Sequence, residues 1–212
     1  MLEVAGRPAL HHVMSIYAAQ GVTSFVLAAG YRRDIIESWA GTLTEGWSVQ
    51  VLDTGEDADT GERLVHCLDY VGDTFFATYG DGLGNVPVLR TLERHQTTQA
   101  GMTVTVVPLP SPYGTLHIDD DARVRDFREK PRLEDHLINA GYFVVERAAL
   151  DEASSAGPSL ERDMLPAMAA QQRLFAYRHD GFWRSMDTHK DVLELDQLAR
   201  EEGTPWMDLD RS

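Results

Sequence analysis

The pattern of hydrophobic and polar positions changes character midway along the chain. In the first half, short apolar runs such as VTSFVLAAG (residues 22–30) and MTVTVVPL (residues 102–109) alternate with amphipathic segments. Apolar runs of this length are typical of buried parallel strands, and the segments between them have a helical period. We therefore expect helices over residues 7–20, 31–40, 60–72 and 86–96, and strands over residues 22–30, 47–53, 74–82 and 102–109. Thr60 is the expected N-cap of the third helix.

After Pro110 the pattern is typical of antiparallel structure. Residues 114–129, GTLHIDDDARVRDFRE, predict two strands around an acidic turn. The remaining expected elements are strands over residues 139–146 and 174–188, a helix over residues 159–171 kinked at Pro166, and a last helix over residues 189–202. No linker-like stretch interrupts the chain. We predict a single α/β domain over residues 1–212, with a mixed, mainly parallel sheet, helices on both faces and an inserted antiparallel hairpin.

Composition and charge exclude several classes of partner. The chain has 212 residues, 43% of them hydrophobic, and a formal net charge of -15. Nucleic acids and anionic membranes require a basic surface, so we expect neither as a partner. The sequence has no apolar run long enough for a transmembrane helix and no signal-peptide pattern, and its single cysteine, Cys67, fits a reducing cytoplasm. A small phosphorylated ligand remains compatible with this charge.

The strongest local signal for chemistry is TYGDG. Asp81 lies between Gly80 and Gly82 at the end of an apolar strand, and open α/β sheets bind ligands at the carboxyl ends of their strands. A carboxylate flanked by bare backbone can hold Mg²⁺ while a phosphate approaches. The alternative is an ordinary turn, because Asp-Gly is common turn chemistry.

Two further candidates stand in FWRSMDT and FREKP. Asp187 could be a second ligand of the same Mg²⁺, or the N-cap of the last helix. Lys130, one of only two lysines, precedes a proline, which favours an extended conformation at a strand end. From there it could meet a phosphate as a point charge, or it could be a solvated surface lysine.

Other polar clusters have simpler explanations. His11 and His12 are expected to be half in the core and half at the surface of their helix. The triplet Asp119-Asp120-Asp121 is expected to be a solvated hairpin turn, although acidic triplets can also hold Ca²⁺. Cys67 lies on the apolar face of a helix and is expected in the core.

The order of several motifs carries a resemblance. In sequence they are MLEVAGRPALHHVM, VLAAGYRRDII, VLDTGEDADTGERL, TYGDG, YGTLHID, FREKP, NAGYFV and GFWRSMDT. From Met1 to about Trp206 the chain resembles the sugar-1-phosphate nucleotidyltransferases, and among them the glucose-1-phosphate cytidylyltransferases. The resemblance implies a Rossmann-like (GT-A-like) fold, a homo-oligomer, and transfer of a nucleoside monophosphate from a nucleoside triphosphate to a sugar 1-phosphate with release of pyrophosphate.

The resemblance also implies roles for individual residues. Asp81 and Asp187 would hold Mg²⁺, Lys130 would bind the sugar phosphate, and Glu129 would bind the sugar hydroxyls. The remaining implied substrate-binding residues are Thr60, Gly61 and Arg63 near the nucleobase, Gly80 beside the metal, and Gly114, Asn139 and Gly141 around the sugar.

Two departures from the family pattern stand out. Family members begin with a strand and a glycine-rich, triphosphate-binding loop, and Met1 here matches a position after that loop. Three explanations of this missing loop compete. In the first, the start is placed at an internal methionine or the chain is shortened. In the second, the chain is naturally short and its sheet is repaired by another segment or a partner. The third is a relative that has lost catalysis. In TGERL, Glu62 stands where the related cytidylyltransferases usually have glycine, so cytidine is the favoured base rather than the required one. Glucose is likewise the favoured sugar. The alternatives are another hexose, a cyclitol phosphate, another scaffold-sharing sugar-phosphate enzyme, or a nucleotide-sugar-binding regulatory subunit.

Overall fold

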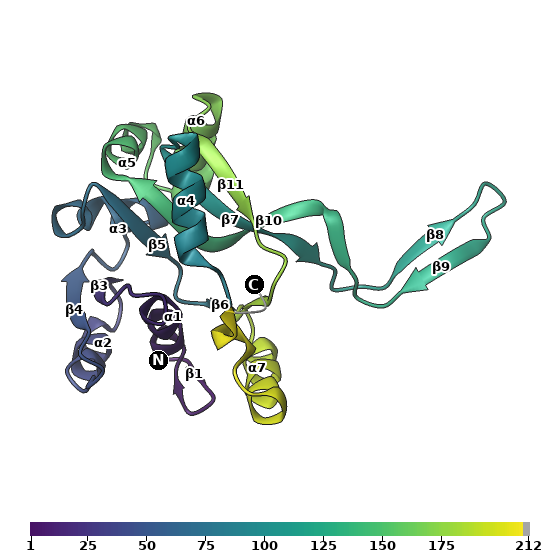
Figure 1. Cartoon of the computed structure of the whole chain (residues 1–212), viewed down its shortest axis with the longest axis horizontal. Coiled ribbons are helices and arrows are strands. Elements are labelled where there is room, and N and C mark those ends of the chain that lie inside the picture. Colours follow the sequence, from purple (N-terminus) through teal and green to yellow (C-terminus); the bar gives the residue numbers. More distant parts are fainter. Residues whose placement is uncertain (210–212) are drawn as a thin grey trace.

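A four-stranded mixed sheet forms the centre of the protein. The structure is a computed structural model that describes residues 1–209. The strand order of the central sheet is β11-β7-β10-β5 (Figure 1). Its strands are β5 (Thr74–Thr78), β7 (Met102–Pro110), β10 (Arg132–Glu146) and β11 (Leu174–Arg178). β11 runs parallel to β7, whereas β10 runs antiparallel to both of its neighbours.

The other strands form small separate sheets. β3 (Ser24–Ala29) and β4 (Ser48–Asp53) pair in parallel, and two short antiparallel pairs join β1 (Glu3–Val4) to β2 (Arg7–Pro8) and β6 (Gly82–Gly84) to β12 (Trp183–Ser185). Within residues 1–209, β3 pairs only with β4, and β5 pairs only with β10. The expectation of a mainly parallel sheet is therefore wrong. Because β10 lies antiparallel between β5 and β7, those two strands, which run in the same direction, are never neighbours.

Seven α-helices surround the sheets in the described part of the chain. They are α1 (Ala9–Ala18), α2 (Arg33–Ala40), α3 (Thr60–His66), α4 (Val88–Thr98), α5 (Arg147–Ala153), α6 (Leu165–Ala170) and α7 (His189–Glu202). Figure 1 places α5 and α6 on one side of the central sheet and α1 and α7 on the other. Among residues 1–209, none of the helices is long and apolar enough to cross a membrane.

Two helix termini differ from the expectation. The N-cap of α3 is Asp59 rather than Thr60, because the Asp59 carboxylate and the Glu62 side chain form a reciprocal capping box. The expected helix over residues 159–171 begins as a π-helical turn over Leu160–Met164, and Pro166 lies in the first turn of the following α6. The π-helical turn runs directly into α6, so Pro166 lies within one continuous helical segment, at the point where its backbone changes from π- to α-helical.

The core has two clusters, one on each face of β10. Tyr142 belongs to the cluster that includes residues of α1 and α7, and Phe143 belongs to the cluster that includes residues of α5 and α6. Successive residues of a strand point to opposite faces, so β10 anchors both clusters. His11 and His12 are both buried, contrary to the expected half-exposed pair. His12 contacts the carbonyl oxygen of Val4 at 2.8 Å, which supplies the hydrogen bond that a buried imidazole requires.

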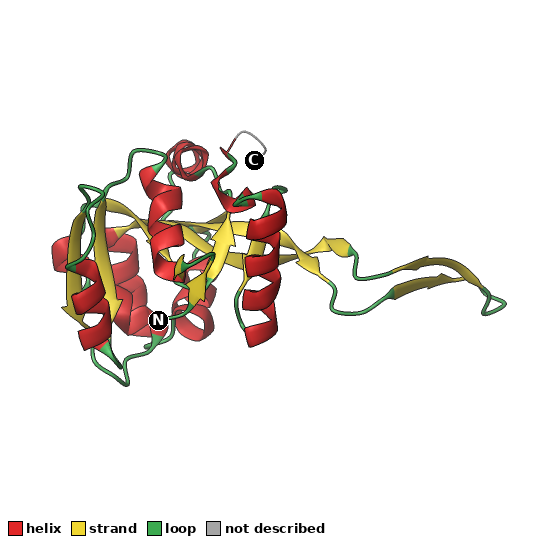
Figure 2. Cartoon of the chain, turned by 90° about the horizontal axis from the view of Figure 1, so that it is seen from below, coloured by secondary structure: helices red, strands yellow, loops and turns green. Residues whose placement is uncertain are grey.

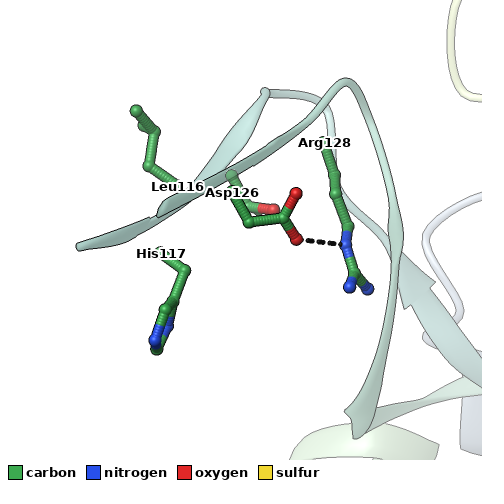
Figure 3. Close-up of a pocket in the computed structure, with 5 residues that line it drawn as sticks. Leu116, His117, Asp126 and Arg128 are labelled. Carbon is green, nitrogen blue, oxygen red and sulfur yellow. Dashed lines mark hydrogen bonds and ion pairs between the residues drawn. The ribbon is translucent and has the colours of Figure 1, made fainter. Parts of the chain in front are cut away.

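The expected hairpin is confirmed and extends away from the body of the protein as an arm. β8 (Thr115–Ile118) and β9 (Val124–Arg128) pair in an antiparallel ladder (Figures 1 and 2). In the acidic turn, the Asp119 carboxylate accepts hydrogen bonds from the backbone N–H groups of Asp121 and Arg123. On the arm, Leu116, His117, Asp126 and Arg128 border a surface pocket, with the Arg128 Nε donating to Asp126 over 2.8 Å (Figure 3).

Candidate functional site

The pairing of β6 with β12 brings Asp81 and Asp187 together. Gly82 lies opposite Ser185 in this ladder, and the Met186 N–H donates to the Asp81 carbonyl oxygen over 2.7 Å. The two aspartates therefore emerge at the same end of one antiparallel pair, although they are 106 positions apart in the numbering (187 − 81). The Asp187 carboxylate also accepts a hydrogen bond from the Ser185 hydroxyl over 2.8 Å.

The electrostatics of this pair favour a bound cation. The Asp81 side chain reaches solvent, yet desolvation by the surrounding protein, reinforced by the negative charge of Asp187, raises its pKa above the ordinary aspartate value. A divalent cation between the carboxylates would relieve this repulsion. Residues 1–209 contain no cluster of three or more His, Cys, Asp or Glu side chains arranged around a metal site. Two carboxylates alone suit Mg²⁺, which keeps several waters and takes substrate phosphate oxygens as ligands.

Asp187 is not the N-cap of α7. The cap is Thr188, whose side chain accepts from the Asp191 N–H while the Asp191 carboxylate accepts from the Thr188 N–H. The capping alternative for Asp187 is therefore wrong, and its carboxylate has no part in closing the helix.

Gly80 leaves the surface beside Asp81 open. A Cβ placed on Gly80 would meet no atom within 4 Å, and the residue is exposed. A ligand can therefore approach the backbone here without contacting a side chain of residue 80.

The N-terminus of α3 is held against the π-helical turn. The Thr60 hydroxyl donates to a Glu161 carboxylate oxygen over 2.6 Å and accepts from the Leu160 N–H over 3.0 Å. A Cβ at Gly61 would lie 2.4 Å from the Met164 Cε and 2.6 Å from the Pro158 carbonyl oxygen. The close packing of α3 on this turn thus requires glycine at position 61, whatever else the residue contacts.

The Arg63 guanidinium donates hydrogen bonds to the loop after β4. Its Nη1 donates to the Thr54 hydroxyl over 2.7 Å and to the Gly55 carbonyl oxygen over 2.9 Å, and its Nη2 donates to the Glu56 carbonyl oxygen over 3.0 Å. The planar fork of arginine suits such a set of acceptors. In this structure Arg63 shapes the loop beside α3 rather than presenting an unoccupied cation.

Asn139 and Gly141 lie beside the end of β5. The Asn139 side-chain oxygen accepts from the Gly141 N–H over 2.8 Å, and the Tyr79 N–H donates to the Gly141 carbonyl oxygen over 3.1 Å. Gly141 has φ of +80°, and a Cβ there would lie 2.6 Å from the Tyr79 ring. Gly141 is therefore held directly beside Tyr79, two residues before Asp81 in the sequence, and Asn139 is bonded to Gly141.

Gly114, Glu129 and Lys130 form a second group at the base of the arm. A Cβ at Gly114 would lie 3.1 Å from a Glu129 carboxylate oxygen, so these two residues are neighbours. Lys130 is exposed with φ of +45°, so the expected extended conformation is wrong. The reason is the sharp turn between β9 and β10, where the Pro131 carbonyl oxygen accepts from the Ser111 N–H. Within residues 1–209, no hydrogen bond or ion pair joins this group to Asp81 or Asp187.

Two residues of the site escaped sequence reasoning, Tyr79 and Glu161. The Tyr79 hydroxyl donates to the Glu161 carboxylate, whose other oxygen accepts from Thr60. Tyr79 stood inside the TYGDG motif and could have been found there. Glu161 had no local signal, because its partners lie 82 and 101 residues away in the sequence.

Known proteins are similar to this chain in sequence and in fold. Residues 1–202 match the family described as "Nucleotidyl transferase". The chain is 30% identical to glucose-1-phosphate cytidylyltransferase of Salmonella typhi, covering 97% of this chain and 89% of that protein. It is 34% identical to the probable glucose-1-phosphate cytidylyltransferase of Bacillus subtilis, covering 96% and 88%. The fold is similar to the crystal structure of HddC from Yersinia pseudotuberculosis, with a TM-score of 0.72, 22% identity and coverage of 93% and 88%.

Proposed function

Because the chain belongs to the nucleotidyl transferase family, we propose that it joins a nucleoside triphosphate to a sugar 1-phosphate in a Mg²⁺-dependent reaction. The favoured substrates are CTP and glucose 1-phosphate, in line with the names of the relatives that are 30% and 34% identical. The observation that carries the proposal is the meeting of Asp81 and Asp187 at one end of the β6–β12 pair.

The reaction needs positioning and charge neutralisation rather than a covalent intermediate. A phosphate oxygen of the sugar 1-phosphate forms a bond to the α-phosphorus of the nucleoside triphosphate, and the bond between that phosphorus and the bridging oxygen breaks to release pyrophosphate. Asp81 and Asp187 would hold Mg²⁺, which when bound offsets the negative charge of the phosphates. Fixing both substrates in line supplies a large share of the rate enhancement.

The remaining proposed residues divide into three regions. Thr60, Gly61 and Arg63 belong to the nucleobase side, where Arg63 acts by shaping the loop after β4. Gly80 gives open backbone beside the metal carboxylates. Glu129 and Lys130 would bind the sugar hydroxyls and the sugar phosphate, and Gly114, Asn139 and Gly141 would line the sugar pocket.

The test is pyrophosphate release by the full chain with Mg²⁺, each of the four common nucleoside triphosphates and a panel of hexose and cyclitol phosphates. We expect CTP with glucose 1-phosphate to give the highest kcat/KM. A higher value for another pair would keep the reaction class and replace the substrates. Absence of turnover with every pair, accompanied by binding of a nucleotide-sugar in calorimetry, would overturn the enzyme proposal in favour of a binding or regulatory subunit.

The proposal extends to assembly as a homo-oligomer. Light scattering of the purified chain would measure its mass, and a value near the 23.7 kDa of the single chain at micromolar concentration would contradict this part.

A further inference from the structure

Glu161 connects two segments that are distant in the sequence. One carboxylate oxygen accepts from the Thr60 hydroxyl over 2.6 Å, at the first residue of α3. The other accepts from the Tyr79 hydroxyl, directly after β5. One glutamate side chain therefore spans from the start of a helix to the end of a strand of the central sheet.

Close packing holds both ends of this connection. On the helix side, Gly61 packs so tightly against Met164 and Pro158 that a Cβ would not fit. On the strand side, the Tyr79 ring packs against Gly141 and the Tyr79 N–H donates to the Gly141 carbonyl oxygen. Glu161 itself lies in the π-helical turn over Leu160–Met164, a rare backbone form that is frequent at functional sites.

The charges around Glu161 indicate an indirect role. Partial burial works to raise the pKa of Glu161. Hydrogen bonds from Thr60 and Tyr79, together with weaker ones from Ser159 and its own backbone, outweigh this and hold the pKa below the usual value, so the side chain is an anion at neutral pH. The Tyr79 hydroxyl donates to this anion, and Tyr79 stands two residues before Asp81 in the sequence.

We propose that Glu161 is a positioning residue that fixes Thr60 and Tyr79 relative to each other and so couples the nucleobase side of the site to its metal side. The inference rests on the proposed function, because it assigns Thr60 to the nucleotide and Tyr79 to the neighbourhood of Asp81. Glu161 acts through these two side chains and does not touch the reacting atoms.

Two substitutions separate the span of Glu161 from its charge. In Glu161→Gln, the amide keeps the length and can still accept from one hydroxyl and donate to the other. In Glu161→Asp, the charge remains but the side chain is one methylene shorter and cannot reach both partners. We expect Glu161→Asp and Glu161→Ala to lower kcat/KM about 10- to 100-fold, as for loss of a hydrogen bond to a charged group, and Glu161→Gln to stay within about threefold of the parent. A larger loss in Glu161→Gln than in Glu161→Asp would overturn the proposal, since charge would then matter rather than span.

The kinetic constants give a second, independent readout. We expect Thr60→Val to raise KM for the nucleoside triphosphate, Tyr79→Phe to lower kcat, and Glu161→Ala to change both. A Glu161→Ala effect confined to one constant, or present only as a lower melting temperature, would contradict a coupling role. Glu152→Gln is the control. Glu152 lies on α5 and forms an exposed ion pair with Arg173, so removing its charge should leave both constants unchanged.

Hydrogen exchange of the unliganded full chain tests the connection without any turnover. Glu161→Ala should speed amide exchange at Glu62, whose N–H donates to the Pro158 carbonyl oxygen, and at Tyr79, whose N–H donates to the Gly141 carbonyl oxygen. Glu161→Gln and Glu152→Gln should leave both amides unchanged. Unchanged exchange at either segment in Glu161→Ala would overturn the inference. If exchange responds as expected but the parent chain neither turns over nor binds nucleotide, the connection stands and the proposed function fails.

Discussion

The backbone N–H of Met186 donates to the carbonyl oxygen of Asp81 over 2.7 Å. This bond continues the ladder in which Gly82 lies opposite Ser185, and it fixes the chain on both sides of the carboxylate pair. The spacing of Asp81 and Asp187 is therefore set by backbone hydrogen bonds rather than by flexible side chains. A site built in this way is ordered before any ligand arrives, as electrostatic catalysis requires.

Asp81→Asn and Asp187→Asn should each lower kcat for pyrophosphate release about 100-fold or more, because each removes a charge from the metal pair. Asparagine keeps the side-chain shape, so the circular dichroism spectrum should not change. Asp69→Asn is the matched control, since Asp69 is an exposed partner of Arg147 on the surface. Equal activity of Asp81→Asn and the control would contradict the assignment of Asp81.

Asp81 should also give the apoprotein a specific dependence of stability on pH. Desolvation and the nearby Asp187 charge raise its pKa, so above the ordinary aspartate value of about 3.9 the folded state binds more protons than the unfolded chain. The stability that this group contributes is present below that value and is lost as the pH rises through the raised folded pKa. We expect Asp81→Asn to raise the melting temperature at pH 7 in EDTA, and the gain to shrink toward pH 4. Calorimetry across this range checks the prediction, and a gain that is constant with pH would refute it.

Gly141→Ala should lower stability, whereas Gly80→Ala should lower nucleotide affinity without lowering stability. At Gly141, φ of +80° and a Cβ 2.6 Å from the Tyr79 ring make alanine strained and crowded, so the free energy of unfolding should fall by about 1–3 kcal/mol. At Gly80 a Cβ would meet nothing within 4 Å, so the melting temperature should hold while affinity for the nucleotide falls. Chemical denaturation and calorimetric titration measure the two quantities. The contrast fails if Gly80→Ala is the less stable variant.

The two lysines of the chain form a natural pair of test and control. Lys130 is exposed at the turn between β9 and β10. On α7, the Lys190 Nζ lies 3.6 Å from the Glu194 Oε1. We expect Lys130→Ala to raise KM for the sugar 1-phosphate about 10-fold or more, because a charge-assisted contact to phosphate is lost, and Lys190→Ala to leave it unchanged. Saturating sugar 1-phosphate should also protect Lys130, and not Lys190, from a lysine-directed reagent. Equal protection of both lysines would count against the phosphate role.

Sequence reasoning located most elements but misjudged how the strands pair. The hairpin over residues 114–129 and the last helix over residues 189–202 were predicted closely, because an acidic turn and a helical period are local signals. The mainly parallel sheet was not observed, because strand direction depends on pairings such as β10 with β5, which join residues more than 60 positions apart. The N-cap of α3 was misplaced by one residue because Asp59 and Thr60 are both good capping residues.

The amino-acid sequence by itself determined the α/β class, the hairpin, the candidate residues Asp81, Lys130 and Asp187, and the family. These depend on local patterning and on the order of motifs. Only the tertiary structure decided that Asp81 and Asp187 share one strand pair, that Arg63 holds a loop, and that Glu161 joins Thr60 to Tyr79. The physical reason is that hydrogen bonds between segments about a hundred residues apart are selected by packing of the whole chain. The local hydrophobic periodicity of the sequence does not indicate them.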